Sequence, residues 1–93
     1  MDCKCKFVRK RDGRIVPFKI DNITKAIFGA ANSVGGHDDV QSKDLARKVV
    51  DKLCAKYPSE FDIPSVDDIS DITEYVLIKA GHVRTSKAYI IYR

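Results

Sequence analysis

The sequence has no apolar run near the roughly 20 residues that a membrane-spanning helix needs, and its start lacks the apolar stretch of a secretory signal. Tryptophan is absent and cysteine is scarce, with only Cys3, Cys5 and Cys54. An odd number of cysteines does not form a disulfide framework, so we expect free thiols and a reducing, cytoplasmic location. No second Cys or His pair accompanies Cys3 and Cys5, which excludes a four-ligand zinc site.

Motifs for phosphate-binding loops and for catalysis are also missing. There is no G-x-x-x-x-G-K-[ST], and Gly35-Gly36 lacks the strand-then-helix setting of a dinucleotide fingerprint. Neither histidine lies in an acid–base motif. Asp67-Asp68 resembles a catalytic dyad, but its place in the first turn of a predicted helix explains it better, because carboxylates favour that end of the helix dipole. We therefore expect no catalytic residue, no metal ligand and no enzyme activity in this chain by itself.

Positive charge is concentrated at the start of the chain. Residues 1–19 hold seven Lys or Arg and two Asp, whereas the remaining residues hold ten basic and eleven acidic groups. The net charge of +4 therefore belongs to one short segment, which favours a local phosphate site over a broad nucleic-acid surface. We expect a ragged segment over residues 1–5 and one domain over residues 6–93.

The basic segment is predicted to form a β-hairpin. Residues 6–10 and 14–18 are expected as antiparallel strands around Asp12-Gly13, a favoured centre of a type I′ turn with positive φ at both positions. Lys10, Arg11 and Arg14 would then crowd at the tip, and an anionic partner would relieve their repulsion. The plainer interpretation is a solvated tip whose charges protect an edge strand. Residues 60–64 alternate polar and apolar side chains and are expected as a third strand.

Four later segments show apolar residues at helical spacing. Asp21, Ser42 and Ser65 are expected as N-caps, and Asp68 would complete a capping box with Ser65. The first helix would direct its free amides toward the hairpin, which is a ready anion site beside Lys and Arg. The predicted fold is α+β, a small antiparallel hairpin or three-stranded sheet that caps a four-helix bundle. The four segments cover residues 21–34, 42–57, 65–80 and 85–93.

Four blocks of residues, in this order, carry a resemblance to a known family. They are Val-Arg-Lys-Arg-Asp-Gly-Arg at 8–14 with Pro-Phe at 17–18, the apolar positions 23 and 26–27, the segment 63–72, and Ala-Tyr-Ile at 88–90 followed by Tyr-Arg at 92–93. Together they resemble the ATP-cone domain, a nucleotide-sensing module at the N-terminus of many ribonucleotide reductases and in a bacterial repressor of reductase genes. The resemblance covers nearly the whole chain.

The resemblance implies that ATP or dATP is held under the hairpin as an allosteric ligand, with Mg²⁺ as a candidate companion of the phosphates. Val8 and Ile23 would touch the base or sugar, and Lys10 and Arg11 would touch the phosphates. The nucleotide-binding residues implied in this way are Val8, Arg9, Lys10, Arg11, Lys19, Asn22, Ile23 and Lys25.

This chain departs from the family pattern at two positions. Lys19 stands where the family often has an acidic residue, and Asn22 stands where it often has lysine, so Lys19 or Lys25 is expected to supply the missing cation. Cys3 and Cys5 do not supply the zinc ribbon that precedes the domain in the repressor, which favours a reductase as the parent.

The function that the resemblance implies is a regulatory domain. It would sense the adenine nucleotide and act on the catalytic domain or subunits of a parent reductase through their arrangement. Homo-oligomerisation stays open, and neither nucleic acid nor a membrane is expected as a partner. The alternatives are a nucleotide-responsive module of a DNA-binding repressor and a docking domain whose hairpin meets an acidic protein surface.

Overall fold

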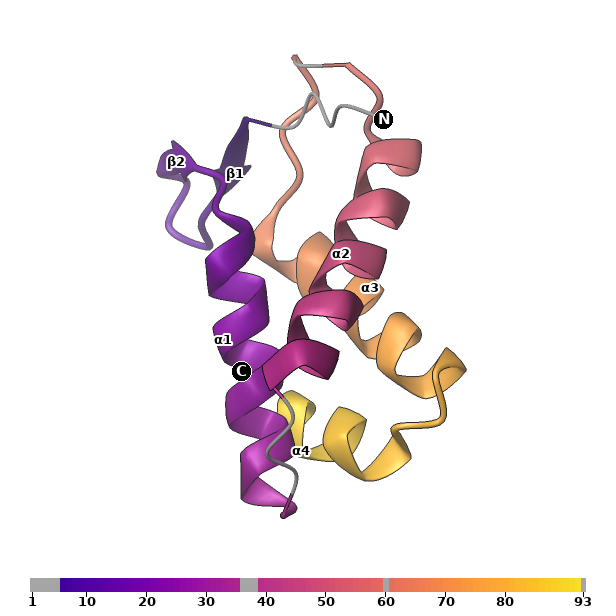
Figure 1. Ribbon diagram of the computed structural model, residues 1–93. Helices are drawn as coiled ribbons and strands as arrows, with labels where there is room; N and C mark the ends of the chain where they lie inside the picture. The colour runs from indigo at the N-terminus through magenta and orange to yellow at the C-terminus, as the bar shows by residue number, and fades with distance from the viewer. Residues whose placement is uncertain (1–5, 36–38, 60, 93) are drawn as a thin grey trace.

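Four helices and one short hairpin make up the described part of the chain, residues 6–35, 39–59 and 61–92 of the computed structural model (Figure 1). The hairpin lies across one end of the helical bundle, next to the start of α1. The predicted α+β class with a helical bundle is confirmed, and the predicted ragged segment 1–5 lies outside the described residues. The elements are β1 Phe7–Arg9, β2 Ile15–Pro17, α1 Ile20–Ser33, α2 Asp39–Lys56, α3 Val66–Lys79 and α4 Val83–Tyr92.

The hairpin is antiparallel with Val8 opposite Val16, but its turn differs from the prediction. The Lys10 amide donates to the Arg14 carbonyl at 2.8 Å, and the Gly13 amide donates to the Lys10 carbonyl at 2.9 Å. Gly13 has φ 90°, whereas no non-glycine residue of the described chain has positive φ. The predicted type I′ turn, which needs positive φ at Asp12 as well, is therefore wrong. A three-residue loop needs only one left-handed residue, and Gly13 supplies it.

The third strand predicted over residues 60–64 is not confirmed. The Arg9 amide donates to the Pro64 carbonyl at 2.9 Å, and one parallel bridge joins Arg9 to Ser65, the residue that follows this segment. Pro64 has no amide hydrogen to donate to β1, which limits the formation of a strand ladder at this position. The bridge nevertheless fixes β1 to the residues that open α3.

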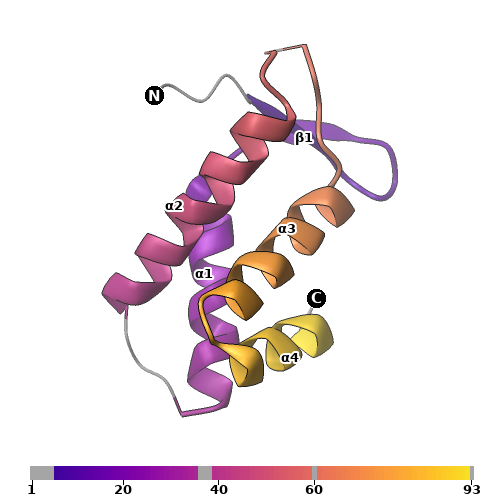
Figure 2. The ribbon, with the colours of Figure 1, turned by 90° about the vertical axis from the view of Figure 1, so that its right-hand side faces the viewer.

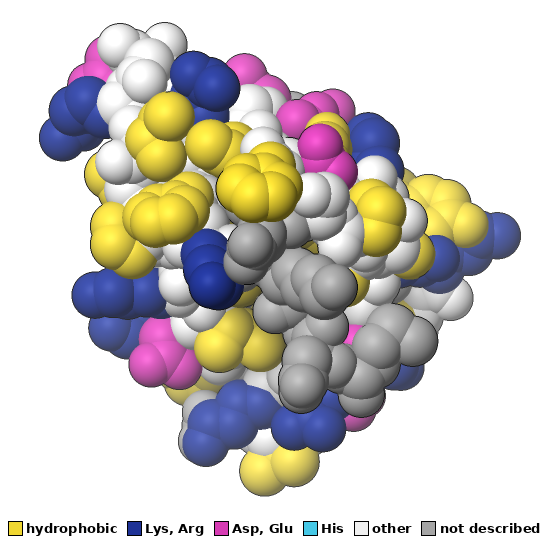
Figure 3. Space-filling model, turned by 90° about the horizontal axis from the view of Figure 1, so that it is seen from above, with side chains coloured by type: hydrophobic (Ala, Val, Ile, Leu, Met, Phe, Trp, Pro, Cys, Tyr) yellow, Lys and Arg dark blue, Asp and Glu magenta, His cyan; other side chains and the backbone are white. Residues whose placement is uncertain are grey.

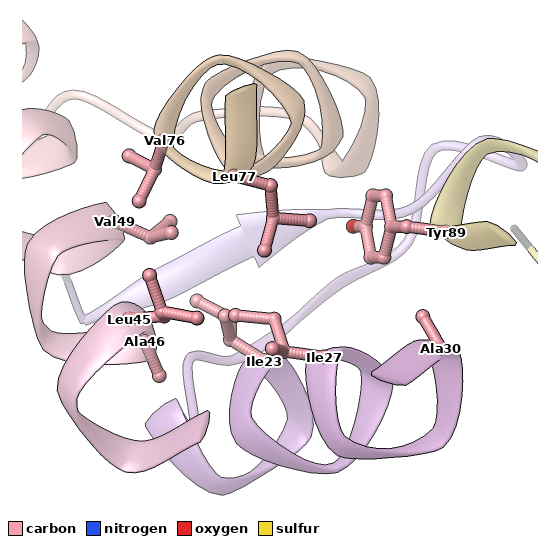
Figure 4. Packing of buried hydrophobic residues seen from close by; sticks show 9 residues of the cluster. All are labelled: Ile23, Ile27, Ala30, Leu45, Ala46, Val49, Val76, Leu77 and Tyr89. Atoms are coloured by element: carbon pink, nitrogen blue, oxygen red, sulfur yellow. The ribbon is translucent and has the colours of Figure 1, made fainter. Parts of the chain in front are cut away.

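The core is formed by side chains from all four helices, which point toward one another in Figure 4. Ile27, Val49 and Leu77 are fully buried, and the ring of Tyr89 closes the core from α4. Figure 2 shows α2 and α3 side by side, with α1 behind them and α4 crossing near the far end of α3. The cluster consists of Ile23, Ile27, Ala30, Leu45, Ala46, Val49, Val76, Leu77 and Tyr89.

Two of the three predicted helix caps are wrong. Helix α1 begins at Ile20, so Lys19 takes the cap position without a side-chain hydrogen bond and Asp21 lies in the first turn. Its carboxylate still favours the positive end of the helix dipole there. Helix α2 begins at Asp39, and Ser42 is buried inside it rather than capping it.

The capping box at α3 is confirmed. The Asp68 amide donates to Ser65 Oγ at 3.0 Å, and the Ser65 amide donates to Asp68 Oδ2 at 3.1 Å. Two amides at the helix start are satisfied by this exchange. The start of α3 is therefore fixed both by its cap and by the bridge to β1.

Cys54 lies half-buried on α2 and is disulfide-bonded. The prediction of a free thiol is therefore wrong for Cys54, and the cytoplasmic location stays a prediction. Among the helices of the described chain, none combines the length and the apolar character that crossing a membrane requires.

Candidate functional site

A hollow of about 150 Å³ lies under the hairpin, between α1, α3 and α4. Its volume is below the roughly 300–1,000 Å³ of typical small-molecule sites, so it accommodates part of a ligand and leaves the rest at its open side. Five of the eight predicted binding residues line it, namely Val8, Lys10, Lys19, Asn22 and Ile23. Arg9, Arg11 and Lys25 are not among the lining residues.

The inner wall of the hollow is apolar. The alternation of β1 turns Val8 toward the bundle, where its side chain is 8% exposed, while its neighbours Phe7 and Arg9 face outward. Ile23 comes from the first turns of α1 and is also buried, and Phe18 adds its ring between β2 and α1. Such a wall suits a planar or aliphatic part of a ligand, because contact there removes apolar surface from water.

The mouth of the hollow is cationic. Lys10 follows β1 and Lys19 precedes α1, and neither forms an ion pair within the described residues. The α1 amides of the first turn receive no side-chain cap from Lys19. The Asn22 amide of this turn donates to the Lys19 carbonyl at 3.1 Å. A helix start next to two lysines is an arrangement that favours an anion. Seen from above, this end of the molecule shows hydrophobic side chains beside Lys and Arg (Figure 3).

The other two cations of the hairpin tip have partners within the protein. Arg11 donates through Nη2 and Nε to Asp67 Oδ1 at 3.1 and 3.2 Å, and Arg14 Nε donates to Asp12 Oδ2 at 2.7 Å. The predicted repulsion at the tip is therefore relieved inside the molecule for Arg11 and Arg14. Asp67 belongs to the first turn of α3, so an anionic ligand would compete with it for Arg11.

The sequence did not identify six further lining residues. The informative ones are Ser70 and Tyr89, which are buried and form a hydrogen bond from the Tyr89 hydroxyl to Ser70 Oγ at 3.4 Å. Two polar residues, Ser70 and Thr73, lie on the buried face of α3, and the serine was the available signal for this polar pair. The six residues are Phe18, Ala26, Val66, Ile69, Ser70 and Tyr89.

The two acidic residues at the start of α3 have structural partners. Asp67 pairs with Arg11, while Asp68 accepts hydrogen bonds from the Ser65 amide and from the Tyr57 hydroxyl at 2.8 Å. These two donors, the Ser65 amide first, hold the pKa of Asp68 below its usual value. The hydrogen bond to Asp68, helped by burial, raises the pKa of Tyr57 to about 12. Asp68 thereby joins the end of α2 to the start of α3. Across the described ranges, no group of three or more His, Cys, Asp or Glu is placed to hold a metal ion.

Comparison with known proteins gives a match over this same arrangement. The family model described as the ATP cone domain matches residues 6–93. A vitamin B12-dependent ribonucleoside-diphosphate reductase of Thermoplasma acidophilum is 41% identical over 93 residues, which cover 95% of this chain and 12% of that protein. The enzyme of the same name from Mycobacterium tuberculosis is 38% identical over 86 residues, covering 92% of this chain and 12% of the relative.

A reductase of another kind is also similar. The anaerobic ribonucleoside-triphosphate reductase of Haemophilus influenzae is 31% identical over 86 residues, again 92% of this chain and 12% of the relative. The chain thus spans about an eighth of the length of the curated relatives that it matches.

Proposed function

Because this chain belongs to the ATP cone domain family, we propose that it is the regulatory domain of a ribonucleotide reductase and binds ATP or dATP in the hollow under the hairpin. The observation that carries the proposal is the pairing of an apolar wall with two lysines that form no ion pair within the described residues and with a start of α1 that has no side-chain cap. This combination matches a ligand that is apolar and planar at one end and polyanionic at the other.

In the proposed complex, the base and sugar lie against Val8 and Ile23, and the phosphates face Lys10 and Lys19. Asn22 lines the same side of the hollow and can offer its amide to the sugar or a phosphate. Arg11 would join the phosphates by leaving Asp67. Arg9 and Lys25, which are exposed and do not line the hollow, would act only through their charge.

Any Mg²⁺ would arrive with the phosphates. The described residues bring together no set of three acidic, His or Cys ligands, so phosphate oxygens and water would supply most of the ligands of the ion. The contribution of the protein would be the positive charge that balances the remaining phosphate oxygens.

Regulation would follow from how many elements the ligand touches. A nucleotide in the hollow contacts the hairpin, α1, α3 and α4 together. If ATP and dATP contact these elements differently, they favour different arrangements of the domain against the catalytic part or subunits of the reductase. Assembly of several copies is one form that such an arrangement could take.

Isothermal titration calorimetry of the intact chain with ATP, dATP and AMP tests the proposal. We expect micromolar or tighter binding of both triphosphates and weaker binding of AMP, because the cations of the mouth act on phosphates. Lys10→Gln should weaken ATP binding, whereas Lys87→Gln on the exposed surface of α4 should not. Equal affinities for AMP and ATP would contradict the assigned phosphate side.

A salt series separates nucleotide sensing from DNA binding by the same cations. A duplex binder that makes 6–10 phosphate contacts loses roughly 10³–10⁵-fold in affinity between 50 and 200 mM salt. A nucleotide that also contacts the apolar wall should lose far less, because apolar contacts are little screened. Salt-resistant, sequence-selective DNA binding that ATP does not displace would favour the repressor alternative.

A further inference from the structure

A second cavity, of about 360 Å³, lies between α2 and α3. The view in Figure 2 looks onto these two helices, which run side by side. Val76 forms part of its floor and is buried, whereas the walls carry charged side chains. This α2–α3 groove is lined by Lys48, Asp51, Lys52, Val76, Lys79 and Ala80 and shares no lining residue with the hollow under the hairpin.

Two lysines of the α2–α3 groove are held near one exposed aromatic ring. Lys52 Nζ lies 4.9 Å and Lys79 Nζ lies 5.6 Å from the centroid of the Tyr75 ring, which is 47% exposed. Neither ammonium forms an ion pair within the part of the chain that is described. The ring attracts both cations, but it does not neutralise them. The groove therefore keeps two positive charges close together without a carboxylate partner.

The other charged residues of the groove balance one another. Lys48 lies one helical turn before Lys52, and its Nζ is 3.5 Å from Asp44 in an exposed pair. Asp51 is the only carboxylate among the lining residues. With Lys48 paired to Asp44, the positive charges of the groove that lack an ion pair within the described residues are those of Lys52 and Lys79, one on each of the two helices.

We propose that the α2–α3 groove docks an acidic segment of a protein partner. The lining residues include no arginine and no residue from the start of a helix, so the groove lacks the amides and the guanidinium fork that gather around one small anion. An extended acidic segment fits better, because its successive carboxylates can meet Lys52 on α2 and Lys79 on α3 at once. The matched relatives are about eight times longer than this chain, so a large protein surface is available to such a domain.

Fluorescence anisotropy with a labelled poly-glutamate peptide tests the docking on the intact chain. At about 50 mM salt, where screening is modest, we expect the peptide to bind. Lys52→Gln/Lys79→Gln should weaken that binding about tenfold, because it removes two charge pairs. A control with the same change in net charge, Arg84→Gln/Lys87→Gln on α4, should retain most of the affinity. Thermal melts and ATP titrations should show that the groove variant is folded and still binds nucleotide.

Several results would overturn the proposal. Absence of peptide binding to the intact chain would do so, and so would an equal loss in the groove and control variants, which would indicate a general charge effect. A loss confined to Lys10→Gln/Arg11→Gln would place the peptide at the hairpin instead. Displacement of the peptide by inorganic tripolyphosphate at equal charge concentration would assign the groove to small anions. Since the two cavities share no residue, failure here leaves the nucleotide site untouched.

Discussion

Asp67 should oppose nucleotide binding although it supports the fold. Its carboxylate holds Arg11 at 3.1 Å, with both side chains more than half exposed. A phosphate that takes Arg11 must break this pair, which is worth about 0.2–1 kcal/mol at an exposed site. Asp67→Asn weakens the hold on Arg11, because it leaves at most a neutral hydrogen-bond acceptor, and it also removes a negative charge at the start of α3. We therefore expect ATP to bind about two- to fivefold more tightly to this variant.

The same substitution should lower stability. Asp67 lies in the first turn of α3, where a carboxylate is worth about 0.3–1 kcal/mol through the helix dipole. Calorimetry with ATP and urea unfolding measure the two effects on one protein. Asp44→Asn is the matched control, since it makes the same charge change at an exposed, paired carboxylate outside the hollow. Weaker ATP binding to Asp67→Asn, or an equal gain in Asp44→Asn, would refute the competition between Asp67 and phosphate.

Other substitutions test the core, the α3 start and the turn. Leu53→Ala should cost about 2–5 kcal/mol in urea unfolding through a core cavity, far more than Lys10→Ala, and the reverse order would contradict the assigned burial. The pKa of Asp68 in the folded state lies below its ordinary value of 3.8, so its carboxylate stabilises the fold at pH above 3.8, and this stabilisation is lost as the pH falls further. Tyr57→Phe removes one hydrogen-bond donor to this carboxylate, so acid unfolding should begin at higher pH. In absorbance titrations, one tyrosine of the intact chain should ionise only near pH 12, a phase that Tyr57→Phe should lack. Gly13→Ala should lower the free energy of unfolding by about 1–2 kcal/mol in thermal melts, because the positive φ of this residue is unfavourable for alanine. The added Cβ would meet no atom within 4 Å, so no steric clash contributes. An unchanged Tm would contradict the positive φ.

Features set by short-range chemistry could be predicted from the sequence. The hairpin around Asp12-Gly13 is in place because a glycine between two apolar runs allows the chain to reverse there. The capping box of Ser65 and Asp68 formed as expected, because its two hydrogen bonds involve residues three apart. The four helices were also predicted from a short-range pattern, because apolar residues three and four positions apart lie on the same face of a helix.

Features that depend on tertiary contacts could not be predicted in this way. The Arg11–Asp67 pair joins residues 56 positions apart, and it changes the hairpin tip from a crowded cluster of cations to one with internal partners. The Tyr89–Ser70 hydrogen bond likewise depends on how α4 packs on α3. The predicted starts of α1 and α2 were wrong, because a polar residue that can cap a helix, such as Asp21 or Ser42, can also lie inside it.

The hollow is walled by residues 8–26 and 66–89, which come from opposite ends of the chain. It exists only when both ends have folded onto each other, so a ligand there binds the native state and neither half alone. Free ligand at 1,000 times its Kd would add about 4.1 kcal/mol to the stability of such a domain. This is comparable to the whole stability of a small protein, about 5–15 kcal/mol. The abundance of the nucleotide would then determine how long the domain survives proteolysis, in addition to any signal that it transmits.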